Sequence, residues 1–375
     1  MNKKLLAVAV AGALAAPGVA LAQSSVTISG FLKMGIQNYK IGNASAARAG
    51  TNTSQGLVHD DSSRIVFNMV EDLGGGLQAI GQIDWRVTPD IGADAVSGNN
   101  HVGLRSKTWG TIIMGRQDLH YFGRESNLTV RNDLQADSIA LLAFVAGAGV
   151  APGGVAIAGA TRTPNVVHYT TPDWGGLKAV LAYSTSGAAA TEADIGSGIR
   201  RGRAWNVAPV FQGRNFTIGY SYWSQKTDAL VVNGDQRGDR LFGSYRWGGF
   251  HIGLAWDKSK LKNAVTGVEA ANRTAWSIPI EYSWGPHWVG GHFTKARDDK
   301  ATSGLQDGAR MWALGYNYSL SKRTSVGVTY ASIRNDEFAT YTPFTSNGAL
   351  GGGAAHTALP GEDPRFWSMT LRHAF

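Results

Sequence analysis

Strict alternation of apolar and polar residues along almost the whole chain is the feature that most limits its fold. From Val26 onward, every second residue of the first run is apolar, and the residues between them are mostly polar, with Lys33 among them. The same pattern returns in later segments, at 64–69, 77–86, 216–222, 250–256, 276–284 and 312–318. Successive side chains point to opposite faces of a β-strand, whereas a helix repeats every 3.6 residues. The chain is therefore predicted to be all-β.

The connections between these runs alternate in length. Short turns recur, for example at Gly74-Gly75 and Gly285-Pro286. Longer polar stretches lie near 40–60, 89–97, 119–163, 187–199, 227–236, 261–269, 300–306 and 336–363. Short turns at one end and long loops at the other describe an antiparallel meander. Counting hairpins predicts sixteen strands, from about 24–39 to about 364–375.

A soluble β-sandwich would also alternate, but three features favour a barrel that spans a membrane. The apolar faces end in Trp and Tyr, as in interfacial girdles, while the opposite faces carry Lys, Arg, Gln and Asp. Strands of this length can cross a bilayer when tilted. An even-numbered meander can close, so that no backbone edge is left unpaired in lipid. The predicted fold is a sixteen-stranded antiparallel transmembrane β-barrel.

The N-terminal segment 1–22 is predicted to be a cleaved signal peptide. Lys3 and Lys4 precede an apolar run, and residues 20–22 (Ala-Leu-Ala) form a small-x-small cleavage site. Removing 22 of the 375 residues leaves a barrel domain, 23–375, and lowers the net charge from +8 to +6 because two lysines are lost. Cysteine is absent, so an exported protein of this size must be stabilised by something other than disulfides.

One segment departs from the alternation. Residues 138–160 form an uncharged run rich in Ala, Val and Gly, long enough for a transmembrane helix. Gly147, Pro152 and Gly153 interrupt it, and predicted strands flank it on both sides. We interpret it as part of a long loop, 119–163, that packs against protein inside the barrel.

Several short motifs resemble those of Gram-negative general porins of the betaproteobacterial type. They are SVTISG at 25–30, SRI at 63–65, EDLGGGLQA at 71–79, VGL at 102–104, GTIIMGRQ at 110–117, NVVHY at 165–169, Pro172, GGL at 175–177 and LRHAF at 371–375. The resemblance extends over the whole mature chain. It implies a trimeric outer-membrane channel for passive diffusion of ions and small hydrophilic solutes, with the third loop, 119–163, folded into the lumen as a constriction.

The resemblance also implies an electric field across the constriction, between basic residues of the wall and acidic residues of the loop. The candidate basic residues, which match by position or lie on the polar face, are Lys33, Arg64, Arg86, Arg105, Arg116, His168 and Arg372. The candidate loop acids are Glu125, Asp133 and Asp137. Parity leaves the direction of Arg116 open, because its neighbours Ile112 and Met114 look lipid-facing. The basic excess favours anions.

The same resemblance implies the partners. The C-terminal Phe375 is expected to act as an assembly signal that the barrel-assembly machinery reads, after periplasmic chaperones have escorted the chain. Outer-membrane lipid and lipopolysaccharide would surround a homotrimer. The basic residues are scattered singly, so nucleic acid is not expected. No cofactor or metal motif is apparent in the sequence.

Other function classes remain as alternatives. A substrate-selective outer-membrane channel is not excluded by the motifs, and a barrel with a plugged lumen comes after it. A barrel enzyme would need a nucleophile beside an activating base, but no catalytic motif surrounds any histidine. His287 and His292 are five residues apart in a predicted strand, so they are expected on opposite faces rather than as a metal pair.

Overall fold

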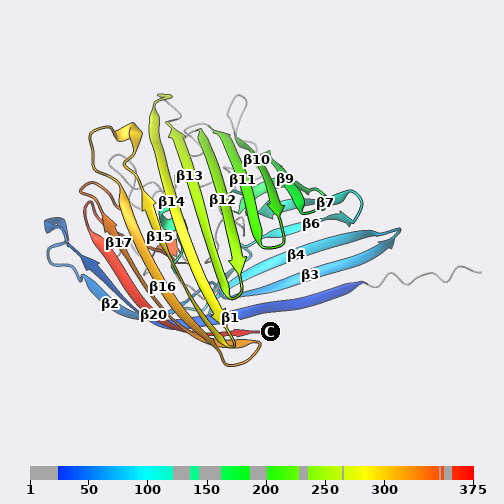
Figure 1. Ribbon diagram of the computed structural model, residues 1–375, viewed down its shortest axis with the longest axis horizontal. Helices are drawn as coiled ribbons and strands as arrows, with labels where there is room; N and C mark the ends of the chain where they lie inside the picture. The colour runs from blue at the N-terminus through cyan, green and yellow to red at the C-terminus, as the bar shows by residue number, and fades with distance from the viewer. Residues whose placement is uncertain are drawn as a thin grey trace, which may run out of the picture.

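The computed structural model describes residues 24–120, 136–142, 162–185, 201–227, 235–263, 266–345, 348–349 and 357–375. Within these ranges, the strands lie side by side around a common interior and close into a barrel, with the C-terminal residue beside β1 (Figure 1). The main sheet has 18 strand segments. Two pairs of segments, β2 with β3 and β5 with β6, each form one interrupted strand. The barrel therefore has sixteen strand positions, as predicted.

The barrel strands are β1 (Ser25–Gly42), β2 (Ser54–Asp60), β3 (Arg64–Gly74), β4 (Leu77–Thr88), β5 (Ala93–Ala95), β6 (Asn100–Ser106), β7 (Gly110–Gln117), β8 (Thr163–Thr170), β9 (Leu177–Ser184), β10 (Arg201–Gln212), β11 (Phe216–Thr227), β12 (Gln236–Trp247), β13 (Phe250–Lys262), β14 (Glu269–Trp284), β15 (His287–Ala296), β16 (Ala309–Ser319), β17 (Thr324–Asn335) and β20 (Asp363–Ala374). A separate ribbon consists of β18 (Phe344–Thr345) and β19 (Gly348–Ala349). The short helices are η1 (Ala46–Arg48), α2 (Ile139–Leu142) and η3 (Lys300–Thr302).

The alternation in the sequence becomes the two faces of the barrel wall. On β1, Ile36 is 58% exposed on the outer face and its neighbour Gln37 is 2% exposed on the inner face. His287 and His292 obey the same rule: His287 stacks on the outward Trp284, whereas His292 is buried inside. The outer face is apolar and aromatic, which suits lipid, and the expected separation of the two histidines is confirmed.

The barrel strand that contains β2 and β3 is interrupted at residues 61–63. The Asp60 carboxylate accepts hydrogen bonds from the backbone N–H groups of Ser62 and Ser63. Ser62 has a φ of 70°, outside the β region. The interruption brings the Asp61 carboxylate into an ion pair with Lys33 of β1 inside the barrel.

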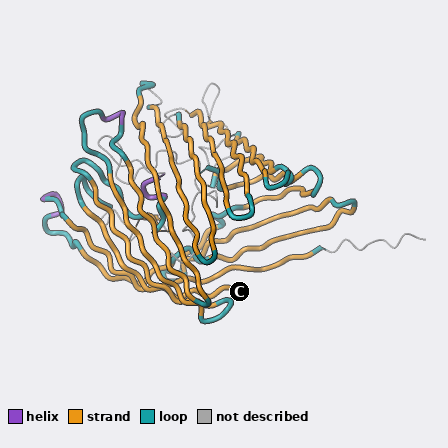
Figure 2. The backbone as a smooth tube through the Cα atoms, viewed as in Figure 1, coloured by secondary structure: helices purple, strands orange, loops and turns teal. Residues whose placement is uncertain are grey.

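Six alanines lie on the inner wall of β13 to β17. These alanines, which we call the alanine wall, are buried and share one apolar cluster: Ala255, Ala275, Ala296, Ala309, Ala313 and Ala331. The helix α2, the short helix inside the barrel in Figure 2, packs against β14, β15 and β16. Its Leu141 and Leu142 are fully buried in that cluster. Small side chains on the wall leave room for these larger ones.

The described part of the apolar run thus packs on protein. Residues 138–142 belong to that part, and they pack against the alanine wall. Residues 143–160 lie outside the described residues. Among the helices that the structure describes, none has both the length and the apolar character needed to cross a membrane.

A buried ion pair joins the loops on either side of the point where the barrel closes. Arg48 of η1 donates from Nε to both carboxylate oxygens of Glu362, and its Nη2 lies 2.6 Å from Glu362 Oε2. Glu362 also accepts hydrogen bonds from the backbone N–H groups of Ser45 and Leu359. The contact holds the loop after β1 against the residues that precede β20.

Candidate functional site

Four of the sequence-predicted bases gather on one part of the inner face. We call Lys33, Arg64, Arg86 and Arg372 the basic wall; they come from β1, β3, β4 and β20. The guanidinium carbons of Arg64 and Arg372 lie 5.0 and 4.6 Å from the ring centroid of Phe31. An aromatic face attracts a cation, so Phe31 holds the two arginines close together without neutralising them.

Two acids partly neutralise the basic wall. Arg86 Nε lies 2.9 Å from Asp84 Oδ1, and Arg64 Nη1 lies 3.7 Å from Asp84 Oδ2. Asp61 pairs with Lys33. Arg64 and Arg86 also each donate to the hydroxyl of Ser62. Four bases thus share Asp61 and Asp84, which leaves an excess of positive charge on this part of the lumen.

The other predicted bases lie elsewhere. Arg105 lies near the short-turn end of β6, where it donates to Gln78. Arg116 occupies a β-bulge in the pairing of β7 with β8, and its Nε donates to the carbonyl of Arg162 at 2.9 Å. A bulge re-aims a side chain, so the alternation of β7 does not extend to Arg116. His168 lines an inner cavity described below.

Of the three predicted loop acids, Asp137 lies within the described residues. Glu125 and Asp133 lie outside the described residues. Asp137 is only 9% exposed. Its carboxylate accepts a hydrogen bond from the backbone N–H of Ile139, at the start of α2. Its described contacts therefore orient the loop.

Side chains of β14 and β15 hold the loop segment 136–142 by hydrogen bonds to its carbonyl groups. Arg273 of β14 donates to the carbonyl oxygens of Leu141 and Leu142, at 2.6 Å for the second. His292 Nε2 lies 3.1 Å from the carbonyl oxygen of Ala136. Because the helix is so short, its terminal carbonyls need such donors.

Arg273 also belongs to a buried group of charged side chains from β12, β13 and β14. Asp257 of β13 lies 3.1 Å from Arg240 and 3.6 Å from Arg273, and none of the three side chains is exposed. We call Arg240, Asp257 and Arg273 the loop anchor. The loop anchor was not predicted from the sequence, because it depends on the register of β12 and β13. There Arg240 stands directly opposite Asp257, and opposite charges at such positions attract.

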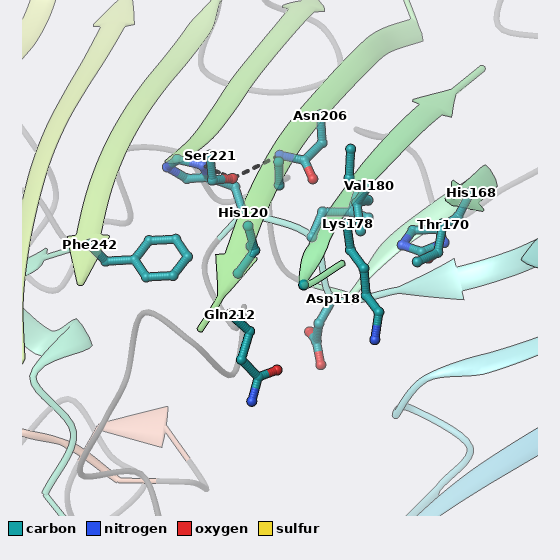
Figure 3. A pocket seen from close by; sticks show the side chains of 15 residues that line it. Asp118, His120, His168, Thr170, Lys178, Val180, Asn206, Gln212, Ser221 and Phe242 are labelled. Atoms are coloured by element: carbon teal, nitrogen blue, oxygen red, sulfur yellow. Dashed lines mark hydrogen bonds between the residues drawn. The ribbon is translucent and has the colours of Figure 1, made fainter. Parts of the chain in front are cut away.

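A cavity of about 230 Å³ opens on the inner face of β8 to β12. Polar side chains from several strands line it, among them Lys178, His168 and Gln212, and the ring of Phe242 points toward its centre (Figure 3). On one side, the hydroxyl of Ser221 links the ring of His120 to the amide of Asn206 (Figure 3). The cavity combines charge, amide groups and an aromatic surface.

A closed barrel with an apolar outer face and a charged inner face defines a transmembrane β-barrel. A model of the Gram-negative porin family matches residues 7–337. The chain is 27% identical to outer membrane porin protein 32 of Delftia acidovorans, with all of both chains covered. It is 26% identical to an outer membrane porin of Bordetella pertussis, covering 90% of this chain and 96% of that one.

Solved structures show the same fold. The anion-selective porin from Comamonas acidovorans superposes with a TM-score of 0.76 at 23% identity, covering 94% of this chain and 100% of that one. The Salmonella typhi OmpF complex with daunomycin gives a TM-score of 0.64 at 14% identity, with 93% and 97% covered. The chain belongs to the Gram-negative porin family. It is an outer-membrane channel for passive diffusion.

The buried Asp137 is expected to make the loop segment 136–142 sensitive to pH. Burial raises the pKa of Asp137 from its ordinary 3.8 to about 6, against the opposing charge of Arg240. The neutral form is favoured in the folded loop, so this contribution to stability is complete below about pH 4 and is lost as the pH rises through about 6. We expect open-channel current noise to be larger at pH 7.5 than at pH 4.5. In the Asp137→Asn variant the noise should be the same at both pH values. A difference as large as in the wild type would show that Asp137 is not the group that titrates.

Proposed function

We propose that this porin passes small hydrophilic anions in preference to cations, as a homotrimer whose third loop, 119–163, narrows the lumen. The observation that carries the proposal is the basic wall. Lys33, Arg64, Arg86 and Arg372 lie together on the inner face, and among the described residues Asp61 and Asp84 form ion pairs with the first three. The likeness in fold to the anion-selective porin from Comamonas acidovorans supports the same direction.

The physical reason is the weak screening in a narrow lumen. Low-dielectric walls concentrate the field of fixed charges, so a few uncompensated positive groups bias ion entry without a tight binding site. The charges of Arg64 and Arg372 are held at fixed positions by Phe31. Their field is therefore present before any solute arrives.

The reversal potential of the purified protein in a potassium chloride gradient tests the preference. We expect chloride to be preferred at about 0.1 M salt and the preference to weaken at about 1 M, where the Debye length falls from about 10 to about 3 Å. Replacing Arg64, Arg86 and Arg372 together by Gln should lower the chloride-to-potassium permeability ratio by roughly twofold or more. Lys322→Gln, on the turn between β16 and β17, is the control. A wild-type pore that prefers potassium at low salt would refute the proposal.

The remaining parts of the proposal concern assembly. We propose that residues 1–22 are removed on export, that periplasmic chaperones and the barrel-assembly machinery deliver the chain, and that the trimer sits among lipid and lipopolysaccharide. A heat-modifiable trimer in mild detergent is the expected form. A monodisperse monomer under those conditions would refute the trimer but leave the barrel. We also propose that the protein acts as a channel without enzymatic activity.

The cavity lined by Lys178, His168, Gln212 and Phe242 favours one alternative, a substrate-selective channel. A site that combines charge with an aromatic surface retains a solute longer than open water does. Conductance separates the two functions, because a general porin conducts without saturation, whereas a selective channel saturates as the concentration of its solute rises. A plugged barrel would not conduct.

A further inference from the structure

The cavity on the inner face of β8 to β12 has the size of one six-membered ring with its substituents. Its volume is about 230 Å³. A cavity of roughly 150 Å³ holds one benzene molecule, and sites for drug-sized ligands begin at about 300 Å³. Thr170 and Ala208, which line the cavity, are half-buried on the inner face, and Gln212 is exposed there. The cavity is therefore open to solutes in the lumen.

An aromatic ring forms one wall of the cavity. Phe242 of β12 stands opposite Gly219 of β11 in the register of the two strands. A Cβ at Gly219 would lie 2.3 Å from Cζ of Phe242, so the ring occupies space that the glycine leaves, and it points toward the centre of the cavity (Figure 3). An aromatic face carries partial negative charge. It attracts the weakly positive C–H groups on the apolar face of a saturated ring.

Neutral polar groups face the same space. The hydroxyl of Thr170 and the side-chain amide of Gln212 can each donate and accept hydrogen bonds. The amide nitrogen of Asn206 donates to the hydroxyl of Ser221 and to the carbonyl of Tyr222, so its carbonyl oxygen is the part that remains for a solute. Hydroxyl groups also donate and accept. A solute that carries several hydroxyl groups therefore matches this side of the cavity.

The charged groups of the cavity already have partners in the protein. Apart from the histidines, the ionisable residues that line it among the described residues are Asp118 and Lys178, which carry opposite charges. Lys178 Nζ lies 3.2 Å from Asp173 Oδ2. The Asp118 carboxylate accepts a hydrogen bond of 2.9 Å from the backbone N–H of Arg162. The cavity thus has no excess of either sign, in contrast to the basic wall, and it suits an uncharged solute.

We propose that the cavity binds a neutral monosaccharide in its six-membered ring form. The apolar face of the sugar lies on the ring of Phe242, and its hydroxyl groups bind Thr170, Asn206 and Gln212. This inference rests on the proposed channel function, because the sugar reaches the cavity through the lumen, and it names the solute class of the substrate-selective alternative. The basic wall then selects among ions, while the cavity retains an uncharged solute.

Planar bilayer recording with D-glucose as the probe tests the site. The recording is made in about 1 M potassium chloride, where the field of the basic wall is screened. A bound sugar displaces water and ions, so we expect the conductance to fall and the decrease to saturate as the glucose concentration rises. Sorbitol, the open-chain relative of glucose, should bind about threefold or more weakly because it must be ordered on binding. Glucuronate, which adds a carboxylate to the same ring, should bind no more tightly than glucose.

Two variants alter the aromatic wall, and each is checked for folding by its heat-modifiable band. Phe242→Leu keeps an apolar side chain but removes the flat face, and it should weaken glucose binding by about threefold to tenfold. Gly219→Ala should weaken it similarly, because the added Cβ displaces the ring. The matched control is Gly327→Ala, at an inward glycine of β17 where the added Cβ would meet the side chain of Asn317 at 3.1 Å. It should bind glucose as wild type does.

Lys178→Gln separates a neutral site from a charged one. Because Lys178 and Asp173 form an exposed ion pair, its removal should change glucose affinity by less than about twofold. A tenfold loss in this variant, or tighter binding of glucuronate than of glucose, would show that the cavity binds by charge and would overturn the proposal. So would wild-type glucose binding in both Phe242→Leu and Gly219→Ala. Conductance in sugar-free salt reports the channel separately: a conducting pore that glucose does not saturate refutes the sugar site alone, and a barrel that does not conduct refutes both.

Discussion

Replacing Arg273 by methionine is expected to free the loop segment 136–142 and to raise both single-channel conductance and open-channel noise. Arg273 gives two hydrogen bonds to the carbonyls of Leu141 and Leu142 and lies 3.6 Å from Asp257. Methionine has a similar reach but no donor. It leaves two helix carbonyls without these donors and leaves Asp257 with one arginine fewer.

The expected size of the change in conductance and noise follows from the burial of Arg273 and its partners. Removing one member of a buried ionic group costs about 3–5 kcal/mol, and a shift of even 3 kcal/mol changes the detached fraction of the loop by more than about a hundredfold. Part of that cost is offset, because Arg240 remains 3.1 Å from Asp257. Planar bilayer recording measures the result. Arg323→Met, on a short turn, controls for loss of charge, and Arg273→Lys should be intermediate. Wild-type conductance and noise in Arg273→Met would show that the anchor does not hold the loop.

Deleting Phe375 is expected to lower the amount of folded barrel in the outer membrane by about tenfold. The backbone N–H of Phe375 donates to the carbonyl of Gly30, and the N–H of Gly30 donates to the carbonyl of Phe375. These bonds complete the pairing of β20 with β1, and a barrel left open at that point exposes unpaired backbone to lipid. Heat-modifiable band shifts of outer-membrane fractions measure the folded amount.

Phe375→Ala separates the two contributions of this residue. It keeps the backbone pairing with Gly30 and removes the ring. If the ring is the signal that the assembly machinery reads, this variant should fail like the deletion, whereas Phe375→Tyr should assemble. Normal levels of folded protein in the deletion variant would refute the role of the last residue altogether.

The strands and their faces were predictable because in a membrane barrel most apolar residues face lipid and most polar residues face inward. Parity assigned Lys33, Arg64 and Arg372 to the inner face, where the structure has them. The break at 61–63 was not predictable by that rule. It arises because the Asp60 carboxylate captures two nearby backbone N–H groups, a local contact that leaves no periodic trace.

The packing inside the barrel was harder to predict than its wall. The inward faces were expected to be mostly polar, but those of β16 and β17 carry alanine with Met311 and Ile333. Small and apolar residues at inward positions were the available signal that something packs there. The partner comes from the loop 119–163, and its register against the wall depends on three-dimensional contacts of Arg273 and His292 that spacing in the sequence does not encode.

Because of the alanine wall, the width of the bore does not depend on the circumference of the barrel alone. The number of strands sets the circumference of the barrel. The buried sector formed by the alanine wall and α2 excludes water from that side of the interior. Exchanging inward alanines for larger or smaller residues would therefore change the bore while the outer surface, the strand count and the contacts with lipid stay the same.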